Sequence, residues 1–235
     1  VVLADAIADC VKLAEKLDAP VACGYQHNDS FPGKHPLAVG PLGYNGSKAA
    51  MEIISKADVV LALGTRLNPF STLPGYGIDY WPKNANIIQV DINADRIGLT
   101  KKITVGICGD AKLVARQILS KLDSNAGDIG REERKALIHQ TKSSWLQTLT
   151  SLDHEDDDEG TTWNKDSRER DPDRMSPRMA WRAIQAGLPQ DAIISSDIGN
   201  NCAIGNAYPT FEEGRKYLAP GLFGPCGYGF PAILG

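Results

Sequence analysis

The chain has 235 residues, enough for one large domain or two ordinary ones, and 42% of them are hydrophobic while 23% are charged. This composition is typical of a globular protein, and a formal net charge of −4 argues against the basic face that nucleic-acid binding requires. No apolar run approaches the ~20 residues of a membrane span. We therefore expect neither a nucleic-acid nor a membrane partner. The five scattered cysteines form no CxxC pair, which favours reduced thiols in a cytoplasmic protein.

Helical and strand patterns alternate through the first half of the chain. Apolar residues at helical spacing and continuous apolar runs predict helix 3–17, strand 21–23, helix 47–57, strands 58–64, 86–91 and 105–109, and helix 111–122. The runs at 58–64 and 86–91 are typical of parallel strands that are buried on both faces. Asp110 is expected to cap the helix that follows it. The alternation predicts an α/β fold with a mostly parallel, Rossmann-like sheet.

A stretch without periodicity, residues 24–46, interrupts this alternation. It is too long for an ordinary connection, and loops of this length in compact domains are usually functional or disordered. Its aromatic residues and prolines argue against disorder, so we expect a functional loop.

The character of the chain changes after Leu122. A linker-like stretch precedes a predicted amphipathic helix over 131–149, and two charged runs, 154–160 and 164–174, are expected to be a solvated excursion between domains. Ser176 and Pro177 read as the N-cap and first residue of a new helix, followed by a buried strand and a second α/β domain. The predicted division is a middle domain over 1–122, a helix and charged linker over 123–175, and the beginning of a further α/β domain over 176–235.

Polar residues follow two strands of the first predicted sheet, where open parallel sheets bind ligands. Gly64 and Arg66 follow one strand and could contact a phosphate or carboxylate. Asp91 ends the next strand, where it could hold a ribose hydroxyl. The alternative is a turn glycine with a surface arginine, and an aspartate that caps a turn. The residues alone leave both open, and no GxGxxG follows any strand.

Two segments near the end of the chain carry a similar signal. Residues 197–201, Asp-Ile-Gly-Asn-Asn, follow the predicted strand and offer backbone and amide donors to an anionic ligand. Residues 224–231 repeat glycine and proline, which suggests that another backbone or a flat ligand approaches closely. A tight apolar turn into a helix that begins at Pro231 is the alternative.

Together these pieces resemble one family. DSFPGKHPLAVGPLGYNG, DVVLALGTRLN, IIQVDIN and GDAKLV resemble the middle domain of thiamin-diphosphate enzymes of the acetolactate synthase type. SSDIGNN and GPCGYGFPAILG resemble the opening of that family's pyrophosphate-binding domain. Within the family, the long loop and the C-terminal run are most similar to the members that convert sulfoacetaldehyde and phosphate to acetyl phosphate and sulfite.

The resemblance implies an acyltransferase of sulfonate and taurine metabolism that uses thiamin diphosphate and Mg²⁺. The active site of such enzymes lies between two subunits, which implies a homo-oligomer, at least a dimer. The chemistry is largely the cofactor's, while the protein positions the reactants. An acetolactate synthase or another thiamin-diphosphate-dependent lyase or decarboxylase is the alternative enzyme. A non-catalytic nucleotide-binding module over 1–122 is the alternative of a different class.

The family's functional positions can be carried over to a few residues. Asn200 and Asn201 match the two positions that contact the cofactor's diphosphate. Gly224 and Cys226 match positions whose backbones bind the aminopyrimidine. Cys226 also stands where many relatives have a larger apolar wedge, so the resemblance supports its backbone role and not its side-chain role.

The remaining candidates lie in or near the predicted middle domain. The resemblance makes His27 and Asn28 candidates for substrate contact and places His35 in a loop that can face the active site. Gly64, Arg66 and Asp91 match positions that hold FAD or another nucleotide in some relatives. Asn93 replaces a second aspartate frequent there, so FAD binding stays open.

Two functional parts of the family are not found in these residues. The activating glutamate belongs to a domain expected before Val1, and the Gly-Asp-Gly metal motif is expected after Gly235, since no GDG occurs here. The chain is therefore predicted to be a fragment without catalytic or metal-ligating residues, inactive by itself.

Overall fold

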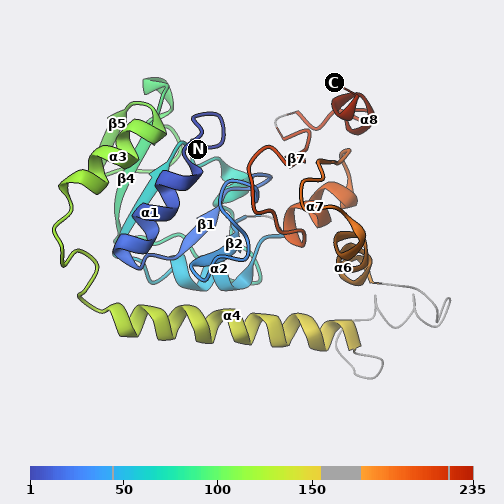
Figure 1. Cartoon of the computed structure of the whole chain (residues 1–235), viewed down its shortest axis with the longest axis horizontal. Helices are drawn as coiled ribbons and strands as arrows, with labels where there is room; N and C mark the ends of the chain where they lie inside the picture. Colours follow the sequence, from blue (N-terminus) through green and yellow to red (C-terminus); the bar gives the residue numbers. More distant parts are fainter. Residues whose placement is uncertain (44, 155–175, 222, 235) are drawn as a thin grey trace.

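The computed structural model describes residues 1–43, 45–154, 176–221 and 223–234 (Figure 1). In this part of the chain the helices are α1 (Ile7–Leu17), α2 (Lys48–Ile54), α3 (Ala111–Lys121), α4 (Arg131–His154), α6 (Pro177–Gly187), α7 (Asn200–Ala207) and α8 (Gly229–Ile233). The strands are β1 (Val21–Cys23), β2 (Ala38–Pro41), β3 (Val59–Leu63), β4 (Asn86–Asp91), β5 (Val105–Cys108), β6 (Ile194–Ser195) and β7 (Tyr217–Leu218). No described helix is long and apolar enough to cross a membrane.

Strands β3, β4 and β5 form a parallel sheet with β4 in the centre. Leu63 of β3 pairs with Val90 of β4, and Asp91 of β4 pairs with Cys108 of β5. Their carboxyl ends therefore meet at one edge of the sheet. The prediction of an α/β fold with parallel strands is confirmed.

The burial of this sheet differs between its strands. In β4 the successive residues Gln89 and Val90, which point to opposite faces, are both buried, as predicted. In β3 only Ala62 is buried and Val59 is 51% exposed, so the prediction that β3 is buried on both faces is wrong. The physical reason is that β3 is an edge strand, and the helix that packs on this sheet, α3, lies on the central strand β4.

Helices α1 and α3 pack against each other, and α3 lies on β4 (Figure 1). The predicted cap of α3 is confirmed, because Asp110 Oδ1 accepts hydrogen bonds from the backbone N–H of Lys112 (2.9 Å) and Leu113 (3.1 Å). Arg116 of α3 reaches back to Asp9 of α1, with Nε donating to Oδ1 at 2.9 Å. The first helix begins only at Ile7, later than its apolar pattern predicts.

The long stretch over 24–46 is not all loop, because Ala38–Pro41 forms β2, parallel to β1. The sequence does not predict this strand, since AVGP contains glycine and proline, two residues that strands disfavour. Tertiary contacts stabilise it instead: Val21 N donates to Leu37 O at 2.8 Å, and Leu42 N donates to Cys23 O at 2.8 Å. Helix α2, which is capped by Ser47, packs on β2.

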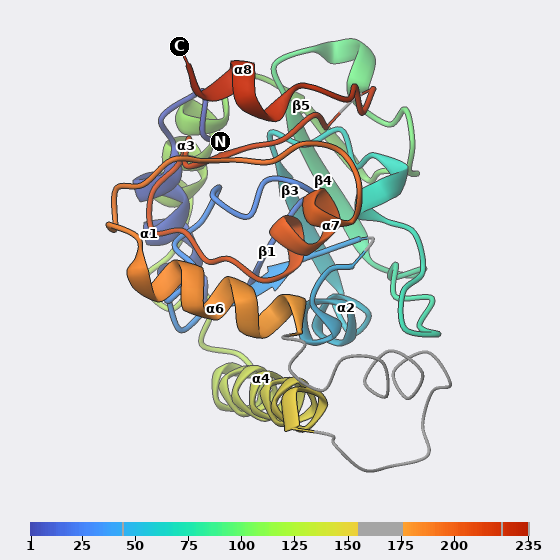
Figure 2. The ribbon, with the colours of Figure 1, turned by 90° about the vertical axis from the view of Figure 1, so that its right-hand side faces the viewer.

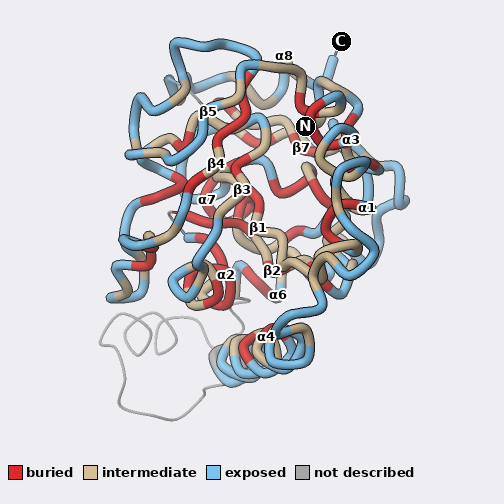
Figure 3. The backbone as a smooth tube through the Cα atoms, turned by 90° about the vertical axis from the view of Figure 1, so that its left-hand side faces the viewer, coloured by how far each residue is buried: buried red, intermediate tan, exposed pale blue. Residues whose placement is uncertain are grey.

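Helix α4 lies against α2 and extends past it (Figure 1). Figure 3 shows it as a largely exposed helix beside the buried core. Ile138 and Thr141 are buried, and Trp145 meets Tyr76 edge-on at a centroid distance of 5.4 Å. The predicted helix is confirmed and extends to His154. Apart from His154 itself, both charged runs, 154–160 and 164–174, lie outside the described residues.

The last part of the chain forms α6, β6, α7, β7 and α8. Figure 2 shows its helices α6, α7 and α8. Ser176 caps α6 by accepting from Met179 N at 3.1 Å, as predicted. The buried strand predicted after this helix has only two paired residues, Ile194 and Ser195, and both are half-buried, so the prediction of a buried strand is wrong. The sequence does not predict α7, which begins at Asn200. The last predicted helix begins at Gly229 rather than at Pro231.

Candidate functional site

One carboxylate, Asp197, holds the two segments of residues 197–201 and 224–231 together. Its Oδ1 accepts a hydrogen bond from Ile198 N at 2.8 Å, and its Oδ2 accepts from Gly227 N at 2.9 Å. The backbone N–H groups, that of Ile198 above all, lower the pKa of the Asp197 carboxyl, although partial desolvation opposes them. The sequence indicates both segments but carries no local signal that Asp197 links them.

Asn200 and Asn201 are exposed at the N-terminus of α7. Gly199 precedes them with φ of +116°, a conformation that glycine adopts without strain. The Asn201 side chain donates from Nδ2 to Asp197 O at 3.3 Å. The first turn of α7 therefore presents two neutral carboxamides beside backbone N–H groups, an arrangement that suits an anionic ligand.

The glycines of the C-terminal segment bring backbones into close contact. A Cβ at Gly229 would lie 3.0 Å from Asp197 N, too close to backbone for a side chain to fit without movement. At Gly224, φ is +57° and a Cβ would lie 3.0 Å from Ile198 Cδ1. The thiol of Cys226 between them is exposed. The repeated glycines are expected to allow the close approach of either another backbone or a flat ligand. At Gly229 it is another backbone that approaches.

The three candidates of the long loop lie in different surroundings. Asn28 is buried, and its Nδ2 donates to Pro209 O at 2.9 Å; its Oδ1 has no hydrogen-bond partner in the described part of the chain. His27 is exposed. His35 lies beside α1, with Nε2 3.3 Å from Glu15 Oε1. The structure thus places Asn28, but not His35, against the part of the chain that includes α7.

Residues at the edge of the first sheet lie as the sequence predicts. Because Leu63 pairs with Val90, Gly64, which follows β3, and Asp91, which ends β4, lie at the same edge. Gly64 has φ of +59°, as a turn glycine does. The buried Asp91 accepts from Asn93 N at 2.9 Å through Oδ1, which is the turn-capping role weighed above. Arg66 is half-buried, and its carbonyl accepts from Thr100 Oγ1 at 2.9 Å.

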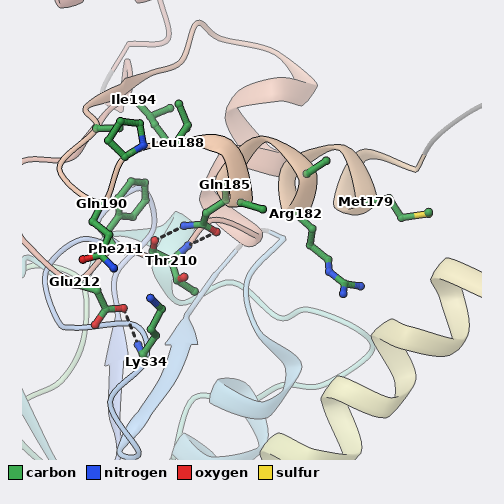
Figure 4. A pocket seen from close by; sticks show the side chains of 14 residues that line it. Lys34, Met179, Arg182, Gln185, Leu188, Gln190, Ile194, Thr210, Phe211 and Glu212 are labelled. Atoms are coloured by element: carbon green, nitrogen blue, oxygen red, sulfur yellow. Dashed lines mark hydrogen bonds between the residues drawn. The ribbon is translucent and has the colours of Figure 1, made fainter.

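A cavity of about 820 Å³ lies between α6 and residues 210–212 (Figure 4). The Gln185 carboxamide lies against the Thr210 backbone, donating to its O and accepting from its N. Lys34 of the long loop donates its backbone N–H to Glu212 Oε1 at 3.1 Å. None of the candidate site residues lines this cavity, so it is distinct from the segments joined by Asp197.

Comparison with known families matches residues 1–118 to the thiamine pyrophosphate enzyme, central domain. The match covers half of the chain. The chain belongs to the thiamine pyrophosphate enzymes. Thiamine pyrophosphate is another name for thiamin diphosphate, so the family identifies the cofactor that the sequence predicts.

Individual relatives of this enzyme chain align with it over its whole length. It is 79% identical over 235 residues to a probable sulfoacetaldehyde acetyltransferase of Rhizobium meliloti, and 75% identical to a sulfoacetaldehyde acetyltransferase of Roseovarius nubinhibens. A probable acetolactate synthase large subunit of Methanococcus aeolicus is 28% identical. All three alignments cover 100% of this chain but only 40%, 39% and 38% of the relatives. The chain thus spans about two fifths of their length.

The donor groups around Asp197 fit part of thiamin diphosphate. The exposed carboxamides of Asn200 and Asn201 are neutral donors at a helix N-terminus, suited to a diphosphate, and a Cβ at Gly227 would meet nothing within 4 Å, so the space before this backbone is open. The described residues offer no comparable fit for a metal ion. The Asp197 carboxylate already accepts backbone hydrogen bonds, and within the described ranges no three His, Cys, Asp or Glu side chains gather as metal ligands would.

Proposed function

We propose that this chain is part of a sulfoacetaldehyde acetyltransferase, which converts sulfoacetaldehyde and phosphate to acetyl phosphate and sulfite. The observation that carries the proposal is identity of 79%, 75% and 71% along all 235 residues to three proteins with that name. Acetolactate synthases reach only 28% to 30%. The difference favours the acetyltransferase over its enzyme alternative.

The reaction needs no external oxidant. The carbon–sulfur bond of sulfoacetaldehyde breaks, sulfite leaves with the bonding electron pair, and the two-carbon unit ends as an acetyl group on phosphate. The aldehyde carbon is oxidised while the methylene carbon is reduced to methyl. Thiamin diphosphate, when bound, supplies the nucleophilic carbon that takes up the two-carbon unit.

Within this reaction we assign the residues of the chain to binding. Asn200 and Asn201 donate hydrogen bonds to the diphosphate, and the backbones of Gly224 and Cys226 hold the aminopyrimidine. Asp197 keeps the two groups together, which supports the assignment. The domain division at 122 and 176 also remains part of the proposal, with the middle domain first and the pyrophosphate-binding domain beginning at Ser176.

Further parts of the proposal concern the whole protein. It uses Mg²⁺ to bind the diphosphate, acts in the cytoplasm in sulfonate and taurine metabolism, and is at least a homodimer. His27 and Asn28 contact the substrate, and the loop of His35 faces the active site. A nucleotide at Gly64, Arg66 and Asp91 has the support of their shared sheet edge alone.

The test uses the full-length protein with thiamin diphosphate, Mg²⁺, phosphate and sulfoacetaldehyde. We expect equimolar sulfite and acetyl phosphate, and neither product without the cofactor. Conversion of pyruvate to acetolactate without sulfite from sulfoacetaldehyde would contradict the proposal and favour the synthase. Absence of any turnover and of cofactor binding would favour the non-catalytic module.

A matched pair of variants tests the binding assignment. Asn200→Ala removes an exposed carboxamide at the start of α7 and should weaken thiamin diphosphate binding by about five- to tenfold, the usual value of one hydrogen bond to an anion. Asn125→Ala, at an exposed position of the connection after α3, is the control and should leave the Kd unchanged. Equal Kd values in both variants would remove Asn200 from the site.

A further inference from the structure

Gln26 has a backbone conformation that is unusual for its residue type. Its φ is +63°, in the left-handed region that non-glycine residues seldom adopt, and it is only 6% exposed. A glycine would adopt this conformation without strain. Strained conformations persist where surrounding contacts over-determine them, and they gather at functional sites.

The first set of contacts joins Gln26 to α7. Its backbone N–H donates to Asn206 Oδ1, and its side chain donates from Nε2 to Cys202 Sγ at 2.8 Å. Cys202 and Asn206 are four residues apart and so lie on one face of the helix. Both are buried, so this face of α7 is bound to the long loop. Asn200 and Asn201 stand at the start of the same helix.

The second set joins Gln26 to the segment that leads into residues 224–229. A Cβ at Gly221 would collide with Gln26 Oε1, so the carboxamide lies directly on the backbone of residue 221. One side chain thus contacts α7 through its nitrogen and the C-terminal segment through its oxygen. Asp197 joins the same two segments through Gly227. The two segments are therefore held at two separate points.

From this arrangement we infer that Gln26 is a positioning residue, which sets the separation between α7 and the C-terminal segment of Gly221 and residues 223–229, and thereby the shape of the thiamin diphosphate site. The inference rests on the proposed binding roles of Asn200 and Gly224. Gln26 itself touches neither group, so it acts through the helix and the segment that it holds. This positioning role also explains why residue 26 is a glutamine although its φ favours glycine. The carboxamide contacts one segment through its nitrogen and the other through its oxygen.

The test compares three variants of the full-length protein. Gln26→Gly keeps the backbone conformation and removes both side-chain contacts. Gln26→Met keeps the length of the side chain without its hydrogen bond. Asn45→Gly is the matched control, because Asn45 has φ of +56° and lies exposed in the same long stretch. The readouts are the Kd of thiamin diphosphate, measured by titration in the presence of Mg²⁺, and the Tm of the protein without cofactor.

We expect Gln26→Gly and Gln26→Met to raise the Kd about five- to tenfold. Gln26→Gly should keep the Tm, because glycine relieves the strain while the contacts are lost, and Asn45→Gly should change neither quantity. A lower Tm with an unchanged Kd would show a purely structural role and overturn the inference. Binding of the cofactor without sulfite release would contradict the proposed substrate but leave the inference intact. A wild-type protein that binds no thiamin diphosphate would overturn both.

Discussion

Asp197 shows how much a single side chain can organise. Its carboxylate accepts backbone hydrogen bonds from Ile198, next in sequence, and from Gly227, thirty residues away. Gly229 allows the two backbones to meet, since any Cβ there would lie 3.0 Å from Asp197 N. Asp197 thus accepts the hydrogen bonds, while Gly229 leaves room for the two backbones to approach each other.

Replacement of Asp197 should loosen this contact. In Asp197→Ala we expect the amide of Gly227 to exchange with solvent at least about tenfold faster, because its hydrogen-bond acceptor is lost. Hydrogen exchange measured by mass spectrometry on peptides over 221–234 provides the readout. Asp95→Ala, at an exposed position, should leave these peptides unchanged.

The same contact should depend on pH. Backbone hydrogen bonds lower the pKa of Asp197 below its ordinary value of 3.8, so its contribution to stability is fully present above that value. It is lost as the pH falls through the lower pKa of the folded state. The difference in exchange between wild type and Asp197→Ala should therefore be constant near neutral pH and disappear in strong acid. A difference that persists unchanged in strong acid would contradict this role of the carboxylate.

At the scale of elements, Arg134 joins the start of α4 to the end of α1. Its guanidinium donates to the carbonyls of Leu17 at 3.0 Å and Asp18 at 3.3 Å, the last of which is the C-cap of α1. It also donates to the carbonyls of Gly127 and Ile129 in the connection before α4. Carbonyls at a helix end lack partners within the helix, and a cation is favourable there.

Arg134→Ala should therefore lower the free energy of unfolding of the full-length protein by about 2 kcal/mol, since several carbonyls lose a charged donor at once. Lys135→Ala is the control. Among the described residues, Lys135 pairs with Glu132 alone, at 3.5 Å and exposed, and such a pair contributes ~0.5 kcal/mol or less. Urea denaturation measures both, and equal losses in the two variants would contradict the role given to Arg134.

At the scale of the whole molecule, the long loop joins two groups of elements. The first group is α1 to α4 with β1 to β5, and the second is α6 to α8 with β6 and β7. Buried Asp29 accepts from Lys216 N at 3.0 Å and Tyr217 N at 3.4 Å, and Gly33 N donates to Phe211 O at 2.7 Å. Asn28 adds its bond to Pro209 O. The two groups of elements are thus connected through buried polar contacts as well as apolar packing, and we expect them to unfold together.

Asp29→Ala should weaken this connection, because it leaves buried N–H groups without an acceptor, at a cost of about 2 kcal/mol. Asp29→Asn keeps one acceptor oxygen and should lose less. Urea denaturation followed separately by tryptophan fluorescence and circular dichroism should show coincident transitions in the wild type and separated ones in Asp29→Ala. Coincident transitions with unchanged stability in Asp29→Ala would contradict the connection.

Local rules account for the elements that the sequence predicts well. Asp110 and Ser176 begin helices because their side chains accept from the first turn, a preference that depends on neighbouring residues alone. Strands 86–91 and 105–108 follow from continuous apolar runs. The missed elements lack such signals. β2 contains glycine and proline, and α7 begins with Gly-Asn-Asn, which is also a common turn sequence.

The sequence by itself determined the alternation of helices and strands, the family, and the two segments proposed to bind the cofactor. Only the tertiary structure decided how those segments are held. Gln26 and Cys202 are 176 residues apart, and Asp197 and Gly227 are 30 apart. Hydrogen bonds over such separations leave no periodic or local pattern, because they depend on where the folded chain returns. The same holds for the left-handed conformation of Gln26, which its residue type disfavours and its contacts maintain.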